Sequence, residues 1–203
     1  GGMASAINVD ARATINGARI GELQDIIARA VAITEQVYWP DLLAIASFYP
    51  EWTKIGGGTP NYLVYGEFPV DIRDTNSYYF KPGVILGNNI SEVRPFDEKL
   101  IREQITASWY DYPAGAPAEG LHPYEGETMP KYTGPQPPWE YLQGLDKYTW
   151  MKAPRYDGLP MQVGPLARIL VAYGQGHPDV QALAKETMDR LNVGPEALFS
   201  TAG

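Results

Sequence analysis

The sequence predicts a mainly helical α+β fold built as a single piece over 1–203. Two stretches, 19–49 and 165–191, repeat apolar residues every three or four positions, a pattern that predicts a bundle of amphipathic helices. Between them, 61–95 is rich in Tyr, Val, Phe and Ile, which favour a small antiparallel sheet. The segment 109–150 follows neither period, and we expect it to be a long loop.

The first expected helix covers about 19–36, after a loop at 1–18. Its apolar residues share one face, which we expect to be buried because the charged residues lie mostly off it. These apolar residues are Ile20, Leu23, Ile27, Val31 and Val37. Pro40 should end or kink the helix, since its ring clashes with the carbonyl group four residues back. A second helical piece is expected at 41–49.

The sheet region should hold extended segments at 61–71 and 77–86. Pro82-Gly83 has the residue order that a β-turn prefers, with proline second and glycine third. We therefore expect the chain to reverse direction at this pair.

A further short helix is predicted at 98–108. Asp97 is the candidate N-cap, because its carboxylate can accept a hydrogen bond from the first free backbone N–H groups. Lys99 and Glu103 would then form an exposed pair one helical turn apart.

The last two helices have clear start signals. The pair Gly164-Pro165 predicts one start, because proline at the first helical position has the required φ and needs no N–H partner. Leu166, Ile169, Leu170 and Tyr173 would form the buried face of this helix. Gly174 offers a left-handed end. His177 precedes a proline that suits the cap of a final helix at 179–191, which Asn192 would close.

The segment 109–150 carries seven prolines, five glycines and nine aromatic residues. This density of proline and glycine prevents a regular element, yet so many aromatic rings are not expected to remain in water. An ordered loop of this length is usually functional or covered by a partner. Disorder is the competing interpretation. Because Tyr and Trp concentrate in the cores of interfaces, we interpret 109–150 as a docking loop.

Composition excludes several classes of function. The net charge of −8 and the lack of a basic block argue against a nucleic-acid partner. No run approaches the roughly 20 apolar residues of a membrane span, and the first residues lack the pattern of a signal peptide. The chain has no cysteine. Its two histidines, His122 and His177, have no acidic pair at ligand spacing, so we predict no metal site wholly within this chain.

Several motifs resemble one known family in the same order along the chain. The run KAPRYDGLPMQVGPLAR at 152–168 resembles the segment with which large subunits of nickel-iron hydrogenases enter their central helices. The segments 37–69, 77–86 and 108–134 resemble that family too, as do GQGHP and LNVGPEALFSTAG near the end. One departure is Gln162, where the family more often has an acidic residue.

The resemblance implies a dihydrogen-splitting oxidoreductase whose nickel-iron centre is held by two CxxC pairs. Neither pair is in this chain. We therefore expect a central fragment of a large subunit, inactive alone, that supplies scaffold and subunit interface. Soft thiolate ligands suit a centre in which nickel changes its oxidation state.

The resemblance also implies a small subunit that carries iron-sulfur clusters. On that basis, the residues expected beside the cluster nearest the active site are His122, Thr128, Lys152 and Arg155. Positive or hydrogen-bonding groups there would stabilise the reduced cluster and raise its potential. For His122, a loop histidine bonded to the backbone remains an equal alternative.

Relatives of the uptake type are exported together with the small subunit, whose signal serves both. The resemblance therefore implies a location in the periplasm or at the periplasmic face of the membrane, with the cytoplasm as the alternative. A non-enzymatic helical scaffold that docks another protein is the alternative function. Carbohydrate processing by paired carboxylates is a third. Its candidates are Glu119, Glu125, Glu127, Asp146 and Asp157.

Overall fold

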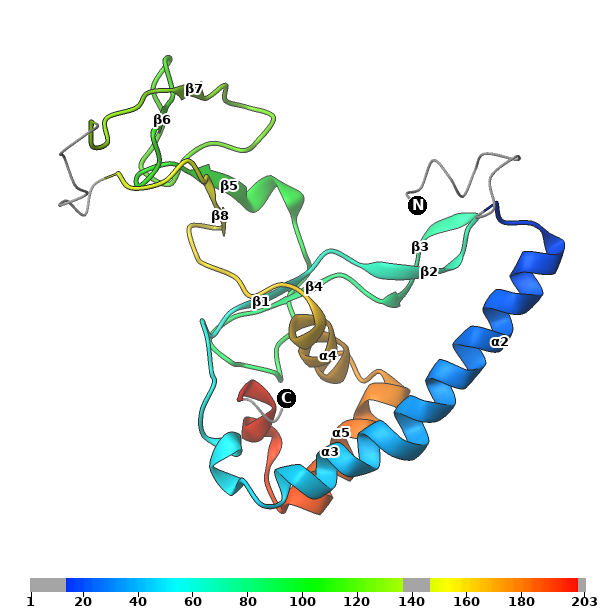
Figure 1. Ribbon diagram of the computed structural model, residues 1–203. Coiled ribbons are helices and arrows are strands. Elements are labelled where there is room, and N and C mark those ends of the chain that lie inside the picture. Colours follow the sequence, from blue (N-terminus) through cyan, green and yellow to red (C-terminus); the bar gives the residue numbers. More distant parts are fainter. Residues whose placement is uncertain (1–13, 137–146, 201–203) are drawn as a thin grey trace.

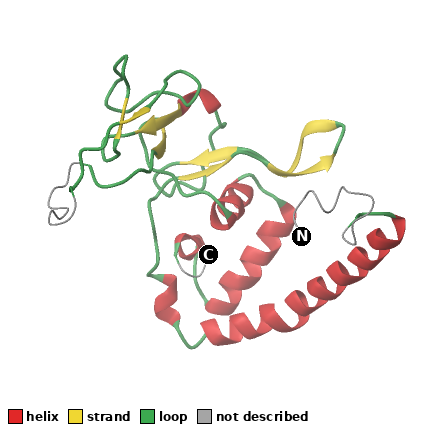
Figure 2. Cartoon of the chain, turned by 45° about the horizontal axis from the view of Figure 1, so that its top comes forward, coloured by secondary structure: helices red, strands yellow, loops and turns green. Residues whose placement is uncertain are grey.

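The computed structural model describes residues 14–136 and 147–200. Figure 1 shows the helices on one side of the molecule, a β-ribbon across its middle, and a lobe of short strands at the end away from the helices. Figure 2 shows the same division after rotation: helices gather below the ribbon, and loops dominate the lobe. The α+β class predicted from the sequence is confirmed.

The first helix continues through Pro40. It consists of α2 (Gly17–Ile33), one π-helical turn (Thr34–Tyr38) and α3 (Trp39–Ala46). The backbone N–H of Trp39 bonds to the carbonyl of Thr34, five residues back. This wider turn lies directly before Pro40 and accommodates a ring that a regular turn would reject. The helix therefore does not end at Pro40, and the second helical piece predicted at 41–49 is present as α3.

The predicted burial of the α2 apolar face is also wrong within this chain. No residue of α2 is buried, and Ile27 is 59% exposed and Val31 47% exposed. The N-terminus is regular, since the Asn16 side chain accepts a hydrogen bond from the Arg19 N–H at 3.0 Å. In α3, Leu43 is the buried residue.

The region 61–95 forms two antiparallel strand pairs, as predicted in type. Strand β1 (Tyr62–Val64) pairs with β4 (Gly83–Ile85), and β2 (Glu67–Asp71) pairs with β3 (Asp74–Phe80). Gly83 begins β4 and does not form a turn, contrary to prediction. Its glycine is needed for packing, because a Cβ there would lie 2.8 Å from Cγ1 of Val171.

The helix predicted at 98–108 is replaced by a 3-10 turn (Glu98–Leu100) and a strand. Strand β5 (Ile101–Gln104) pairs antiparallel with β8 (Ala153–Tyr156). Asp97 is confirmed as a cap, since its carboxylate accepts from the Lys99 N–H at 3.0 Å. Pairing with β8, which lies some fifty residues away in the sequence, overrides the local preference for a helix at 98–108.

The core lies where α4 (Pro165–Gly174) and α5 (Pro178–Leu191) pack beneath β1 and β4. Its buried members are Tyr62, Val64, Ile85, Ala167, Leu170, Val171, Ala184 and Leu198. The predicted start at Pro165 is confirmed, and Asn192 closes α5 as predicted, with a left-handed φ of 54°. Gly174 stays helical, and the positive φ of 77° falls instead on Gly176.

A last 3-10 turn (Pro195–Phe199) closes the core. Over the described ranges 14–136 and 147–200, no helix is long and apolar enough to cross a membrane.

Candidate partner-docking lobe

The segments 101–136 and 147–156 fold into the end of the molecule away from the helices, which we call the β5–β8 lobe. In it β5 pairs with β8, and β6 (Tyr110–Asp111) pairs with β7 (Met129–Pro130). The predicted loop at 109–150 supplies most of this lobe, and 137–146 lie outside the described residues. All four cluster-side candidates fall within the lobe.

Glu103 joins the segments of the lobe. Its backbone N–H donates to the carbonyl of Leu121 at 2.8 Å, and its carbonyl accepts from the Tyr112 hydroxyl at 2.8 Å. In the β5–β8 ladder it faces Pro154, and its carboxylate accepts from Nζ of Lys152 at 3.0 Å. The helix predicted at 98–108 would have paired Glu103 with Lys99, so no signal in the sequence indicated this role.

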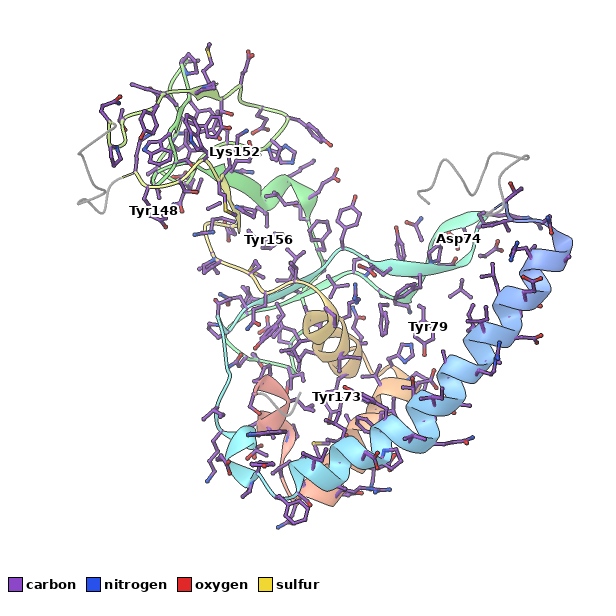
Figure 3. The ribbon with its side chains drawn as sticks, viewed as in Figure 1. Asp74, Tyr79, Tyr148, Lys152, Tyr156 and Tyr173 are labelled. Carbon is purple, nitrogen blue, oxygen red and sulfur yellow. The ribbon has the colours of Figure 1, made fainter. Side chains whose placement is uncertain are left out.

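Lys152 is held in one place by two contacts. Besides Glu103, its ammonium lies 5.6 Å from the centroid of the Tyr110 ring, within reach of a cation–π interaction. The Lys152 and Glu103 side chains are 32% and 24% exposed, so the pair is partly shielded from water. Figure 3 shows Lys152 within the lobe. The carboxylate of Glu103 offsets the charge of Lys152, so this lysine acts there mainly as a hydrogen-bond donor.

Arg155 lies in β8 directly opposite Arg102 of β5. Each guanidinium donates to nearby backbone carbonyl groups: Arg155 Nη1 to Pro154 at 2.8 Å, and Arg102 Nη1 to Ile101 at 2.8 Å. Two like charges directly opposite each other in an antiparallel ladder repel each other. The carbonyl oxygens that accept hydrogen bonds from the two guanidinium groups reduce this repulsion.

His122 makes local bonds. Its Nδ1 accepts from the Tyr124 N–H at 3.2 Å, and its carbonyl accepts from the Glu125 N–H at 2.9 Å. With Nδ1 accepting, the neutral ring carries its proton on Nε2. These contacts match the backbone-bonded alternative, and they leave Nε2 as the group that can donate to a partner. Thr128 is half-buried directly before β7.

An aromatic cluster covers one side of the lobe. Trp109 packs against Tyr132 and Trp150 with ring centroids 4.8 and 5.4 Å apart, and Tyr110 lies 5.5 Å from Trp150. Trp150 and Tyr132 are still 45% and 43% exposed. The indole N–H of Trp109 is buried and has no hydrogen-bond partner within the described ranges. Half-exposed aromatic rings of this kind are enriched at protein–protein interfaces.

Only some of the acidic side chains of the lobe lie close to one another. Asp111 pairs with Lys131 at 2.6 Å, and the hydrogen bond and charge of that lysine lower the Asp111 pKa. Glu119 and Asp157 line one cavity of about 280 Å³ together with Arg102. The other carbohydrate candidates do not line it among the described residues, and Asp146 lies outside them. Across 14–136 and 147–200, no three His, Asp or Glu side chains gather to hold a metal ion.

Gln162 uses its amide as a donor. Nε2 donates to the carbonyl of Thr59 at 2.7 Å, while its backbone bonds to Asn61 and Leu63 beside β1. A carboxylate cannot donate to a carbonyl oxygen, so the acidic residue common in the resembling family would lose this bond. The packing is close as well, since a Cβ at Gly58 would lie 2.8 Å from Nε2 of Gln162.

Comparison with known proteins identifies the family that these motifs resemble. The nickel-dependent hydrogenase family matches residues 1–203. The uptake hydrogenase large subunit of Bradyrhizobium diazoefficiens is 38% identical over 218 residues, which cover 100% of this chain and 36% of that protein. The hydrogenase-1 large chain of Escherichia coli is 34% identical with the same coverage.

Solved structures agree. The Ni-Fe-Se hydrogenase of Desulfovibrio vulgaris Hildenborough in its reduced state superposes with a TM-score of 0.68 at 30% identity, over 93% of this chain and 37% of that one. The chain spans a little over a third of the length of the relatives it matches. The resemblance found in the motifs is confirmed, and the chain belongs to the nickel-dependent hydrogenase family.

Proposed function

We propose that this chain is part of the large subunit of an uptake-type nickel-iron hydrogenase, which oxidises dihydrogen and passes the electrons to a small subunit. Within that subunit, this chain serves as scaffold. Its β5–β8 lobe provides the surface on which an iron-sulfur small subunit docks. The match of the whole chain to uptake hydrogenase large subunits supports the activity. The half-exposed aromatic cluster around Trp109 supports the docking role.

The residues of this chain do not by themselves fit a nickel-iron centre. Soft thiolates are the ligands that suit such a centre, and the chain has no cysteine. We therefore assign no step of dihydrogen cleavage to side chains of 1–203 and expect no dihydrogen turnover with a dye acceptor from this chain alone. Turnover by the isolated chain would contradict this part of the proposal.

Four lobe residues are proposed to face the partner's nearest cluster: His122, Thr128, Lys152 and Arg155. Donors beside a cluster stabilise the negative charge that it gains on reduction. Lys152 is suited to this task because Glu103 and Tyr110 fix its position before any partner arrives. Arg155 and Nε2 of His122 would supply further N–H groups.

The docking role is tested by co-purification with the small subunit of an uptake hydrogenase. We expect a brown complex, and we expect Trp150→Ala in the lobe to weaken it by tenfold or more, since buried Trp residues commonly contribute about 2 kcal/mol or more to binding. Arg29→Ala, on exposed α2, is the matched control and should bind as the parent does. A colourless partner held through the lobe would instead support the non-enzymatic scaffold.

Location forms part of the same proposal. A large subunit that travels with an exported partner is expected in the periplasm or at the periplasmic face of the membrane. Cell fractionation of the assembled pair tests this, and recovery of the pair from the cytoplasm alone would contradict it.

A further inference from the structure

The face of α2 that points toward α5 is apolar, and no other part of 14–136 and 147–200 covers it. A groove of about 750 Å³ runs between α2 and α5, and its lining is mainly apolar. Its principal lining residues are Ile27, Ala30, Val31, Trp39 and Leu183. Three of these side chains, Ile27, Val31 and Leu183, are between 47% and 59% exposed. The 17 residues of α2 include no buried residue, although helices in proteins gain most of their stability from packing of an apolar face.

The apolar surface of α2 extends beyond the groove. Residues on a helix advance by about 100° each, so Ile26 and Ile33 lie to one side of the stripe that contains Ile27. They are 53% and 61% exposed. The exposed apolar arc is therefore wider than the part of α2 that lines the groove.

A second observation concerns Trp39 at the end of the groove. Its indole N–H is buried and has no hydrogen-bond partner among the described residues. Buried donors are normally paired. An occupant of the groove that presents a carbonyl or carboxylate oxygen at this point would complete the pairing.

We propose that helical segments of the large subunit which this chain does not match occupy the α2–α5 groove and cover the apolar arc of α2. This inference rests on the proposed function. It follows from the extent of the match, because the chain covers 36% of the Bradyrhizobium relative and 37% of the Desulfovibrio structure. Nearly two thirds of such a subunit is thus available as cover, and it is tethered to the same molecule.

Two other occupants fit the structure less well. The β5–β8 lobe, where the small subunit is proposed to dock, lies at the end of the molecule away from α2 (Figure 1). A second copy in a two-fold dimer would place the same surface on itself. When two identical grooves face each other, neither one fills the other. In addition, two chains that each carry a net charge of −8 repel each other.

Because the chain has no cysteine, a single introduced cysteine gives a direct test of whether the groove is covered. Ala30→Cys places a thiol in the groove, and Asp25→Cys places one on the exposed side of α2 away from both the groove and Ile33, as the matched control. Each variant is prepared as the 203-residue chain and as a complete large subunit, in which this chain replaces the matched part of the Bradyrhizobium protein. Maleimide labelling rates are then compared, with the labelled peptide identified by mass and no small subunit present.

We expect Ala30→Cys to label about tenfold or more slowly in the complete subunit, where a covered thiol reacts only through local opening. Asp25→Cys should label equally in both. If Ala30→Cys disturbs α2, Thr34→Cys on the same groove carries the test, and slower amide exchange of unsubstituted α2 in the complete subunit is a further readout.

Equal rates for Ala30→Cys in both forms would overturn the proposal. So would protection that appears in the 203-residue chain as its concentration rises, which would indicate a second copy. Because the assay omits the small subunit, its failure leaves docking through the lobe untouched, and failed docking leaves the groove result valid.

Discussion

Nζ of Lys152 lies 3.0 Å from the carboxylate of Glu103, and this ion pair joins β5 to the residue directly before β8. The same Glu103 bonds through its backbone to Leu121 and Tyr112. One residue therefore connects the two paired strands with the loop that carries His122.

Glu103→Gln is expected to lower the free energy of unfolding by roughly 1 kcal/mol, because the partly shielded Lys152 loses its counter-charge while the backbone bonds remain. Urea unfolding of parent and variant measures the difference. The control is Glu92→Gln, which breaks the more exposed pair with Arg94 (3.1 Å) and should cost less than about 0.5 kcal/mol. Equal effects of the two substitutions would show that the Lys152 pair has no special role in the lobe.

Leu170→Ala is expected to destabilise the chain by roughly 2–5 kcal/mol, because it removes methyl groups from the closed core and leaves a cavity. Leu170 is fully buried (0% exposed) between α4 and β1. Leu183→Ala makes the same change on α5 at a site 52% exposed, and within the 203-residue chain its effect should be much smaller. Comparable losses for both variants would contradict the assignment of the core to α4, β1 and β4.

Gln162→Glu introduces the acidic residue that the motif resemblance leads us to expect at this position. We expect it to destabilise this chain by roughly 1–3 kcal/mol at pH 7, because a carboxylate would face the Thr59 carbonyl and leave it unpaired. The matched control is Gln181→Glu, since Gln181 makes an exposed amide bond to the Tyr173 carbonyl at 3.2 Å. Thermal unfolding compares the two. No loss at Gln162 would indicate that its surroundings readily accept a carboxylate.

Tyr79 should make stability depend on alkaline pH. Its hydroxyl donates to Oδ2 of Asp179 at 2.6 Å, and this bond, followed by desolvation and the charge of Asp179, raises the Tyr79 pKa above its ordinary value of 10.0. Figure 3 shows Tyr79 on the side of β3 that faces the helices. A raised pKa means that the folded state favours the protonated phenol. This contribution is complete below pH 10 and is lost as pH rises through the folded pKa.

We therefore expect Tyr79→Phe to reduce the fall in the free energy of unfolding between about pH 9 and pH 11, as measured by urea titrations at fixed pH. The fall should not vanish, because burial also raises the pKa of Tyr62. Tyr124→Phe, at a site 95% exposed, is the control and should leave the pH profile unchanged. An identical profile for Tyr79→Phe would contradict the assigned role of the Asp179 bond.

The sequence alone determined the features that depend on neighbouring residues. Pro165 starts α4 because proline needs no partner for an N–H at that position, Asp97 caps its turn, and Asn192 accepts the left-handed end of α5. The antiparallel pairs at 62–85 followed from local β-propensity. The family followed from motifs that need no coordinates.

Tertiary structure decided what depends on distant partners. Local signals favoured a helix at 98–108, yet β5 forms there because β8, some fifty residues later, satisfies its backbone groups. Glu103 thereby meets Lys152 and not Lys99. Periodicity placed the apolar residues of α2 on one side, but whether that side is buried depends on what packs against it. A helix period fixes which face is apolar, and only the surrounding chain decides whether water reaches it.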